Sequence, residues 1–438
     1  MNFHIDTQTL EELNLLGKYR QGSIYSLFYQ VRTRGGEQLL DNLFHHPLTN
    51  AEAINARSSI LQFFQQADLL FPFDVQEIGM MREYLDTAAG NNTLATLGGT
   101  VIKKLLAGLT RDERYKGLVQ GVQATIGTLN KCWLFLQQMQ PPAGAWHTRV
   151  QEVRELLSDP RLERLRNIDI YKSLSVKILA YYDHLLKNDL NDAMERLLAF
   201  IYELDVYVSV SDVARTRGFT YAKAYPPEKN ILEATGLYHP SLKQAVGNSI
   251  TMGQESNVLF LTGANMAGKS TWMKSVGIAV YLAHMGFPVA AASMYFSVRD
   301  GLYSSINVAD NISLGYSHFY AEVVRVKQAA EAVSSGKRLL VMFDELFKGT
   351  NVKDAYDGTL AVTEAFAGYT ACLFIVSTHI IEVGEVLQQH ANVHCTYMPT
   401  VMEGSIPRYT YQLQEGITED RQGMLIIQNE GILELIEA

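Results

Sequence analysis

The run GANMAGKS, from Gly263 to Ser270, constrains the fold of this chain more than any other feature. It satisfies the pattern GxxxxGK followed by Ser or Thr, follows the apolar segment Val258 to Thr262, and precedes a helical pattern. A glycine-rich loop between a strand and a helix directs backbone N–H groups and the positive end of the helix at an anion. The sequence therefore predicts an α/β nucleotide-binding domain. A glycine-rich turn without a ligand is the alternative.

The residues of this run have separate expected roles. Lys269 would reach the β- and γ-phosphate oxygens of ATP, and the Ser270 hydroxyl would hold Mg²⁺. The loop and the first helical residues would surround the phosphates. The predicted nucleotide-binding residues of this region are Gly263, Ala264, Asn265, Met266, Ala267, Gly268, Lys269, Ser270 and Thr271.

Two later apolar runs end in polar residues. Asp344 and Glu345 follow the first run, and His379 follows the second, Leu373 to Ser377. Because the ends of parallel strands converge on a ligand crevice, Asp344 is expected to complete the Mg²⁺ shell through water. Glu345 is the expected catalytic residue that orients or deprotonates water, and His379 would contact the γ-phosphate or that water. Paired acids can instead cap a helix, and a lone histidine is usually structural.

The two halves of the chain differ in periodicity. Up to about Ala214 apolar residues recur at helical spacing, whereas short apolar runs alternate with helical patterns after Gly218. We expect a multidomain protein: an all-α domain over residues 1–217, then an α/β P-loop domain with a mainly parallel sheet over 218–438. Two helices should bury stripes, one of Met194, Leu197, Leu198, Ile201, Leu204 and Val208, and an earlier one of Leu174, Ile178, Tyr181 and Leu185. The helices form side-by-side rods or an ordinary bundle.

Composition narrows the setting of the protein. The chain has 46 acidic and 37 basic side chains, a net charge of −9, which argues against coating nucleic acid through bulk charge. Its three cysteines form no CxxC pair and leave one unpaired in any disulfide scheme, which favours a reducing, cytoplasmic location. No apolar stretch reaches the roughly 20 residues of a membrane-spanning helix, and the first residues lack a secretory pattern, so we expect no membrane association.

The motifs taken together resemble those of a known family. LFLTGANMAGKST, then INVADNISLGYSHFYAE over Ile306 to Glu322, then LLVMFDEL and STH, occur in the order of the ATPase domain of the MutS mismatch-repair family. The resemblance implies an ABC-type domain that hydrolyses ATP with Mg²⁺. It also implies a homodimer with composite ATP sites, in which Ser317 contacts the nucleotide of the opposite subunit. Alternatively, Ser317 is an ordinary loop serine.

The resemblance extends over most of the chain. Tyr238-His239-Pro240 is similar to the start of the family's ATPase domain, where the loop near Asn248 contributes to the adenine pocket. Asp6, the stretch Arg32 to Leu40, and Glu203 to Arg215 are similar to parts of the MutS core and lever helices. The implied mechanism is a nucleotide-switched dimer whose levers change their separation.

Departures from the family pattern limit what the resemblance implies. No segment precedes the core, so we expect the mismatch-probing and connector domains to be absent, and the helical half leaves little room for a DNA clamp. The chain ends soon after Gly423, so the dimerising tail is expected to be truncated. Ala264 and Ala267 replace the Pro and Gly common in the family. Extra residues after Thr350 leave the register of the D-loop around Asp354 and Asp357 open.

Two functions from different classes follow. In the first, the dimer binds duplex DNA without true mismatch recognition. In the second, it is an ATP-driven switch that acts on a protein partner outside mismatch repair. An ABC transporter ATPase fits less well, because no LSGGQ-type stretch precedes Asp344. The densest basic cluster of the helical half is either a DNA contact or a solvated helix face, and it consists of Lys103, Lys104, Arg111, Arg114 and Lys116.

Overall fold

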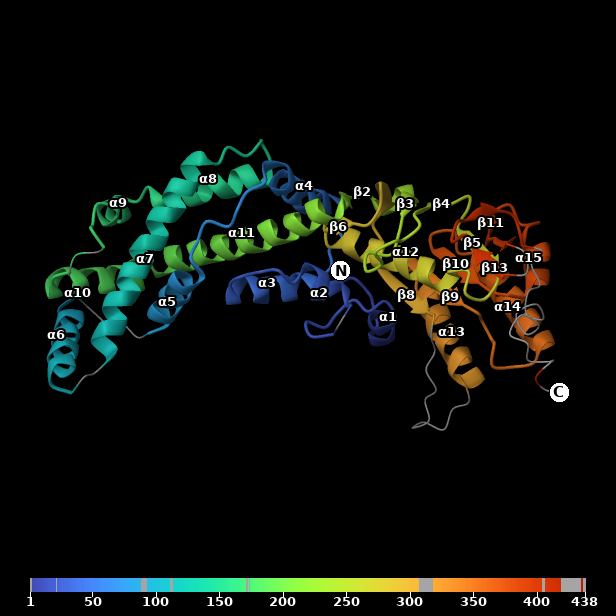
Figure 1. The fold of residues 1–438 in the computed structure, drawn as a ribbon, viewed down its shortest axis with the longest axis horizontal. Coiled ribbons are helices and arrows are strands. Elements are labelled where there is room, and N and C mark those ends of the chain that lie inside the picture. Colours follow the sequence, from blue (N-terminus) through green and yellow to red (C-terminus); the bar gives the residue numbers. More distant parts are fainter. Residues whose placement is uncertain are drawn as a thin grey trace. The chain divides into compact units, whose positions relative to one another are not determined.

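The computed structural model divides the chain into two compact units built from alternating segments (Figure 1). It describes residues 2–20, 22–87, 93–110, 113–170, 172, 174–306, 318–403, 406–418 and 435. The first unit, here called the sheet unit, comprises Met1–Phe28, Leu43–Ser58 and Val213–Ala438. The second, the helical unit, comprises Tyr29–Asn42 and Ser59–Asp212.

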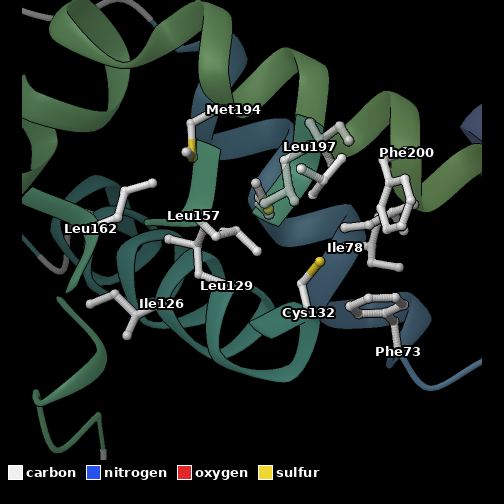
Figure 2. Close-up of a cluster of buried hydrophobic side chains, with 14 of the residues drawn as sticks. Phe73, Ile78, Ile126, Leu129, Cys132, Leu157, Leu162, Met194, Leu197 and Phe200 are labelled. Atoms are coloured by element: carbon white, nitrogen blue, oxygen red, sulfur yellow. The ribbon is translucent and has the colours of Figure 1, made fainter. Parts of the chain in front are cut away.

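The helical unit is held together by one apolar core. Figure 2 shows Met194, Leu197 and Phe200 facing side chains of neighbouring helices, among them Leu129 and Cys132. Helices α3, α4 and α11 have one end in each unit. The elements of this part of the chain are α3 (Arg34–His45), α4 (Ala51–Ala67), α5 (Val75–Asp86), α6 (Thr93–Thr110), α7 (Glu113–Gln138), α8 (Ala145–Leu157), α9 (Pro160–Arg166), α10 (Val176–His184), a π-helical turn η1 (Leu185–Asp189) and α11 (Asn191–Arg217).

One predicted apolar stripe is confirmed and the other is partly wrong. All six predicted residues of α11, from Met194 to Val208, are buried. On α10, however, Ile178 and Tyr181 are 44% and 45% exposed, and the buried residues of that helix include Leu179 and Ala180. The helical spacing was correct, but it did not identify which side of α10 the rest of the unit covers.

The sheet unit is organised around a six-stranded sheet in the order β14-β11-β5-β10-β9-β8. Strands β8 to β11 and β5 run parallel to their neighbours, and β14 is antiparallel to β11. All six residues of β5 are buried, as expected for a strand covered on both faces. The predicted mainly parallel sheet is therefore confirmed. Its strands are β5 (Val258–Gly263), β8 (Gly301–Ser305), β9 (Leu339–Asp344), β10 (Leu373–Ser377), β11 (Val393–Met398) and β14 (Gln414–Glu415).

Helices and smaller sheets surround these strands. A four-stranded sheet has the order β2-β7-β3-β4, and β1–β6 and β12–β13 form antiparallel pairs. The helices are α1 (Thr7–Glu12), α2 (Ile24–Phe28), a 3₁₀ turn η2 (Pro227–Lys229), α12 (Lys269–His284), α13 (His318–Ser334), α14 (Val352–Ala367) and α15 (Ile381–Leu387). The remaining strands are β1 (Thr220–Tyr221), β2 (Lys223–Tyr225), β3 (Leu232–Leu237), β4 (Asn248–Met252), β6 (Pro288–Val289), β7 (Ser293–Ser297), β12 (Thr400–Glu403) and β13 (Ile406–Tyr409).

The two contact units are discontinuous in the sequence, so they do not coincide with the predicted domains 1–217 and 218–438. The predicted domain boundary at residue 217 stays a prediction. The described part of residues 1–217 contains helices and a single β-bridge, between His4 and Gly301. That bridge, together with the packing of residues 43–58, places two N-terminal segments in the sheet unit. Within the described ranges, no helix is both long and apolar enough to cross a membrane.

Candidate nucleotide site

The predicted phosphate-binding loop connects β5 to α12 through unusual backbone conformations. Gly263 and Gly268 have φ angles of 143° and 101°, which favour glycine. A Cβ atom on Gly263 would lie 3.0 Å from the Met398 carbonyl oxygen, so this position also lacks space for a side chain. Met266 has a φ of 71°, a conformation that costs energy in a residue other than glycine. The loop therefore has the tight turn that the glycine spacing predicts.

Lys269 places its ammonium group inside this loop. The residue is buried, and its Nζ donates hydrogen bonds to the carbonyl oxygens of Gly263 at 2.8 Å and Ala264 at 3.1 Å. Burial lowers the pKa of Lys269 below its ordinary value, although the nearby carboxylates of Asp344 and Glu345 raise it. A buried cation beside two acids fits a site that binds an anion together with a divalent metal ion.

Asp344 lies at the carboxyl end of β9, where its register partner on β10 is Ser377. Burial raises the pKa of Asp344, against the lowering effect of the Ser270 and Ser377 hydroxyls and of Lys269. Its buried Oδ1 has no hydrogen-bond partner among the described residues. An unsatisfied carboxylate oxygen near Ser270 fits Mg²⁺ or a water of its shell.

The described ranges contain no group of three or more His, Cys, Asp or Glu side chains arranged to hold a metal ion.

Glu345 and His379 lie beside one another at the ends of β9 and β10. His379 Nδ1 is 4.0 Å from Glu345 Oε1, and the side chain of His379 is 56% exposed. The Glu345 amide donates to the Ser377 carbonyl oxygen at 2.8 Å, which fixes the chain where it leaves the sheet. The structure thus brings together the two residues that sequence reasoning assigned to catalysis.

A cavity of about 530 Å³ adjoins these groups. The predicted residues that line it are Asn248, Asn265, Met266, Gly268, Lys269, Ser270, Thr271 and Glu345. Five predicted residues are not part of the lining: Gly263, Ala264, Ala267, Asp344 and His379. Tyr238 and His239, from the segment similar to the start of the family domain, also line the cavity.

Sequence reasoning missed Tyr411, which also lines the cavity. A Cβ atom on Gly268 would lie 3.0 Å from Tyr411 Cδ1, so the ring closely approaches the phosphate-binding loop. Asn248 holds this segment in place: its Nδ2 donates to the Tyr411 carbonyl oxygen at 2.9 Å, and its Oδ1 accepts from the Leu413 amide at 2.7 Å. No local motif marks Tyr411, because it reaches the loop from about 140 residues along the chain.

Several expectations fall elsewhere. Ser317 and Arg111 lie outside the described residues. Asp354 and Asp357 lie on α14, whose first turn is capped by Asn351, with Asn351 Oδ1 accepting from the Asp354 amide at 3.0 Å. In the predicted basic cluster, Lys103 and Lys104 lie on α6, and Lys116 forms an exposed ion pair of 3.5 Å with Glu113 on α7.

Comparisons with known proteins give the same family over both halves of the chain. The model of MutS domain III matches residues 8–211, and the model of MutS domain V matches residues 259–436. The DNA mismatch repair protein MutS of Leuconostoc mesenteroides is 25% identical over 291 residues, which cover 65% of this chain and 33% of that protein.

Two further relatives agree. The MutS protein of Geobacillus sp. is 26% identical over 237 residues, covering 53% of this chain and 27% of that protein. The DNA mismatch repair protein spellchecker 1 of Drosophila melanogaster is 28% identical over 232 residues, covering 51% and 25%. The chain thus spans about a third or less of the length of these relatives. Because the two domain models together match most of its residues, the chain belongs to the MutS family.

Proposed function

We propose that this protein binds and hydrolyses ATP with Mg²⁺ at the cavity beside Lys269. The observation that carries the proposal is the buried Lys269 ammonium within a glycine-rich loop, next to the carboxylates that follow β9. The loop can bind the phosphates through backbone N–H groups and the N-terminus of α12. The membership of residues 259–436 in the domain V family supports the same function.

Each polar residue of the site then has a defined task. Lys269 compensates phosphate charge, and Ser270 and Asp344 are the residues that would hold Mg²⁺, which neutralises the phosphate oxygens when bound. Glu345 orients the attacking water and accepts its proton. His379, close to Glu345, orients the same water or contacts the γ-phosphate.

Tyr411 and the loop around His239 form the part of the cavity that suits the adenine base of ATP. Tyr411 offers a ring face, and an aromatic ring can stack on a purine. Because Asn248 uses both polar atoms of its amide to hold residues 411–413, we assign Asn248 the role of positioning Tyr411. This assignment replaces a direct contact between its amide and adenine.

The active form in this proposal is a homodimer with composite ATP sites, located in the cytoplasm. Ser317 of each subunit contacts the nucleotide bound to the partner, as the resemblance of Ile306 to Glu322 implies. Hydrolysis would change the relative position of the subunits and thus of whatever they hold. The relatives are named as DNA mismatch repair proteins, so duplex DNA is the first candidate ligand.

A specific observation favours the alternative of a protein partner. Acidic side chains gather around a recess of about 520 Å³ on the helical unit, including Glu152, Glu155, Asp159, Asp189 and Asp192. Arg196 also lines the recess, and Glu152 and Asp159 form ion pairs with Arg149 and Arg161, so only part of this negative charge is available to repel a DNA backbone or to attract a cationic protein surface. The net charge of −9 points in the same direction.

A lysine substitution tests nucleotide binding. In the variant Lys269→Ala the phosphates lose the cation inside the loop, so the affinity for a fluorescent ATP analogue should fall at least about a hundredfold, as expected for a lost buried charge pair. The matched control is Lys243→Ala, which removes an exposed cation close to the cavity and should bind as the unmodified protein does. Tight binding by Lys269→Ala would exclude this site.

Duplex binding separates the two candidate ligands. Contacts to phosphates read charge and not base pairing, so we expect weak DNA binding that falls with added salt. Affinities for matched and mismatched duplexes should agree within a few-fold, measured by fluorescence anisotropy with and without ATP. A clear preference for a G·T mismatch would show that this chain recognises mismatches, and an absence of any salt-dependent binding would favour the protein partner.

A further inference from the structure

Ser377, the last residue of β10, adjoins both acids that follow β9. It is the register partner of Asp344, and neighbouring parallel strands direct the side chains of register partners to the same face of the sheet. Its carbonyl oxygen accepts from the Glu345 amide at 2.8 Å. The backbone of Ser377 therefore holds one acid, and its side chain lies beside the other.

The Ser377 hydroxyl is buried and has no aligned hydrogen-bond partner among the described residues, and the same is true of Asp344 Oδ1. The two groups are close enough to interact: burial has the largest effect and raises the pKa of Asp344, while the hydroxyls of Ser270 and Ser377 lower it. A buried polar group without a partner costs free energy, and folded proteins retain few of them. Two such groups at one register position therefore indicate a role for this edge of the sheet.

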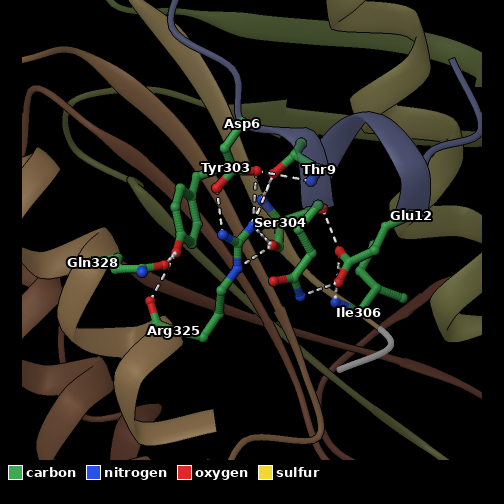
Figure 3. A network of polar contacts seen from close by, with 9 residues as sticks. Asp6, Thr9, Glu12, Tyr303, Ser304, Ile306, Arg325 and Gln328 are labelled. Atoms are coloured by element: carbon green, nitrogen blue, oxygen red, sulfur yellow. Dashed lines mark hydrogen bonds and ion pairs between the residues drawn. The ribbon is translucent and has the colours of Figure 1, made fainter. Parts of the chain in front are cut away.

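A second buried serine of the same sheet, Ser304 on β8, shows how a structural hydroxyl is bound. Its hydroxyl donates to Glu12 Oε2, and its amide donates to the Thr9 hydroxyl oxygen at 3.0 Å (Figure 3). Glu12 is fixed in turn, because the adjacent Leu13 is buried in the sheet unit. The Ser377 hydroxyl has no comparable bond within the described ranges, so it does not connect strands in this way.

The other groups that shift the pKa of Asp344 have tasks of their own in the proposed function. Lys269 compensates phosphate charge, Ser270 would hold Mg²⁺, and Glu345 acts on the attacking water. Ser377 is not part of the cavity lining, so it does not face the nucleotide directly. Its hydroxyl is thus placed to act through Asp344.

We infer that Ser377 is a positioning residue for Mg²⁺, whose hydroxyl donates to the Asp344 carboxylate and orients it toward the metal ion or a water of its shell. This inference rests on the proposed function. Carboxylates at metal sites are commonly held by a hydrogen bond from a neighbouring group, and loss of that neighbour typically lowers the metal affinity by about ten- to a hundredfold. Because β9 and β10 fix both residues, the orientation is built into the sheet.

A single variant tests this role through the linkage between metal and nucleotide. Ser377→Ala removes the hydroxyl and keeps the carbonyl oxygen that accepts from the Glu345 amide. The Kd of a non-hydrolysable fluorescent ATP analogue is measured in EDTA and in excess Mg²⁺, and the ratio of the two values reports how tightly the complex holds Mg²⁺. In Ser377→Ala this ratio should fall about tenfold, while the Kd in EDTA stays within about twofold of normal.

Manganese gives a direct readout of the same site, because Mn²⁺ uses the same oxygen ligands and its free form is visible by electron paramagnetic resonance. Mn²⁺ is titrated into protein held in excess over the ATP analogue, so that free nucleotide does not bind the metal. The Kd for Mn²⁺ should rise about tenfold in Ser377→Ala.

Two other buried serines are matched controls. Ser305→Ala, at the end of β8, should change neither the ratio nor the Tm. Ser304→Ala breaks the hydrogen bond to Glu12, so it should lower the Tm by about 2 to 4 °C and leave the ratio unchanged. Ser377→Ala should keep the normal Tm, because its hydroxyl has no aligned partner to lose.

The outcomes separate this inference from the proposed function. If the unmodified protein binds nucleotide and metal but Ser377→Ala has the normal ratio and the normal Kd for Mn²⁺, the inference is wrong and the proposed function stands. An equal loss of affinity in EDTA and in Mg²⁺ would show a merely structural role, which also overturns the inference. If the unmodified protein does not bind the nucleotide, the proposed function fails and the inference fails with it. Should Ser377→Ala not fold, Ser377→Cys serves in its place, because its thiol is only a weak donor.

Discussion

At the scale of single residues, the site depends on backbone conformations that are unusual for their residue types. Glu345 and Phe347 have φ angles of 53° and 61°, although neither is glycine. Such conformations cost energy and persist where the surrounding structure enforces them, often at functional sites. The hydrogen bond from the Glu345 amide to the Ser377 carbonyl oxygen helps to enforce this one. The backbone at Glu345 is thus held by the ends of two strands.

Replacing that carboxylate by an amide separates binding from turnover. Glu345→Gln keeps the shape of the side chain but cannot accept a proton from water, so ATP should stay bound while kcat falls by about two to four orders of magnitude. Equilibrium binding of a fluorescent ATP analogue and single-turnover hydrolysis measure the two quantities. Glu385→Gln, an exposed change on α15, is the control. Normal turnover by Glu345→Gln would remove this residue from the catalytic role.

From the sequence we could identify site residues whose neighbours in the site are also their neighbours in the chain. The loop from Gly263 to Ser270 was predictable because its glycines, its lysine and the flanking apolar strand are adjacent in the chain. Tyr411 was not predictable, because it approaches Gly268 only after β12 and β13 have brought it back to the cavity. The backbone of Tyr411 has a φ of 56°, but a tyrosine, unlike a glycine, does not indicate such a conformation in the sequence.

At the scale of elements, helix α12 carries a buried histidine that links several segments of the sheet unit. His284 Nδ1 donates to the Leu48 carbonyl oxygen at 2.7 Å, and its Nε2 accepts from the Arg299 amide at 3.2 Å. Phe3 and Phe296 pack against its ring. Burial is the main reason that the pKa of His284 is lowered to about 4; the hydrogen bond to the Leu48 carbonyl opposes this shift, and nearby Arg299 contributes to it.

This histidine predicts acid sensitivity of the sheet unit. Because the folded pKa is lower than the unfolded value of about 6.5, the unfolded state binds more protons between these values, and stability falls as the pH drops from about 6.5 to 4. The loss should reach about 3 kcal/mol at 1.4 kcal/mol per pKa unit. Urea unfolding followed by circular dichroism at several pH values measures it. In His284→Gln, whose amide can donate and accept, the slope over this window should flatten, and an unchanged slope would contradict the assignment.

The elements also show what helical or strand spacing leaves undetermined. Periodicity located α11 and its buried stripe, but Ile178 and Tyr181 of α10 are exposed because spacing does not report which neighbour covers a helix. The contact between His4 and Gly301 joins residues almost 300 positions apart. No local pattern around His4 indicates that partner, so the place of α1 in the sheet unit could not be predicted from the sequence.

At the scale of the whole molecule, each compact unit is assembled from segments that are not adjacent in the chain. The helical unit consists of two stretches and the sheet unit of three. The family models divide the sequence differently, since residues 8–211 match domain III although α1 belongs to the sheet unit. The domains that the family models match and the compact units formed by contacts thus have different boundaries in this chain.

A complementation experiment tests the proposed homodimer as a whole. If the site is composite as proposed, Ser317→Ala and Lys269→Ala damage different halves of it, so a mixed dimer has one site with both lesions and one with neither. ATPase activity, measured by phosphate release, should recover to about half of the normal value per dimer when the subunits are mixed under conditions of exchange. If the mixture had only the summed ATPase activity of the two separate variants, each site would be built within one subunit.

The placement of the first thirteen residues also determines how this protein can be divided in the laboratory. Strand β8 is the last strand of its sheet, and the residues around His4 occupy its outer side through the Leu302 amide. A strand edge without such cover presents free amide and carbonyl groups that pair with other chains and lead to aggregation. A fragment that starts at residue 218 would expose this edge together with the apolar surface left by Leu13. To obtain a soluble sheet unit, residues 1–28 and 43–58 have to be retained, for example through a short linker to residue 213.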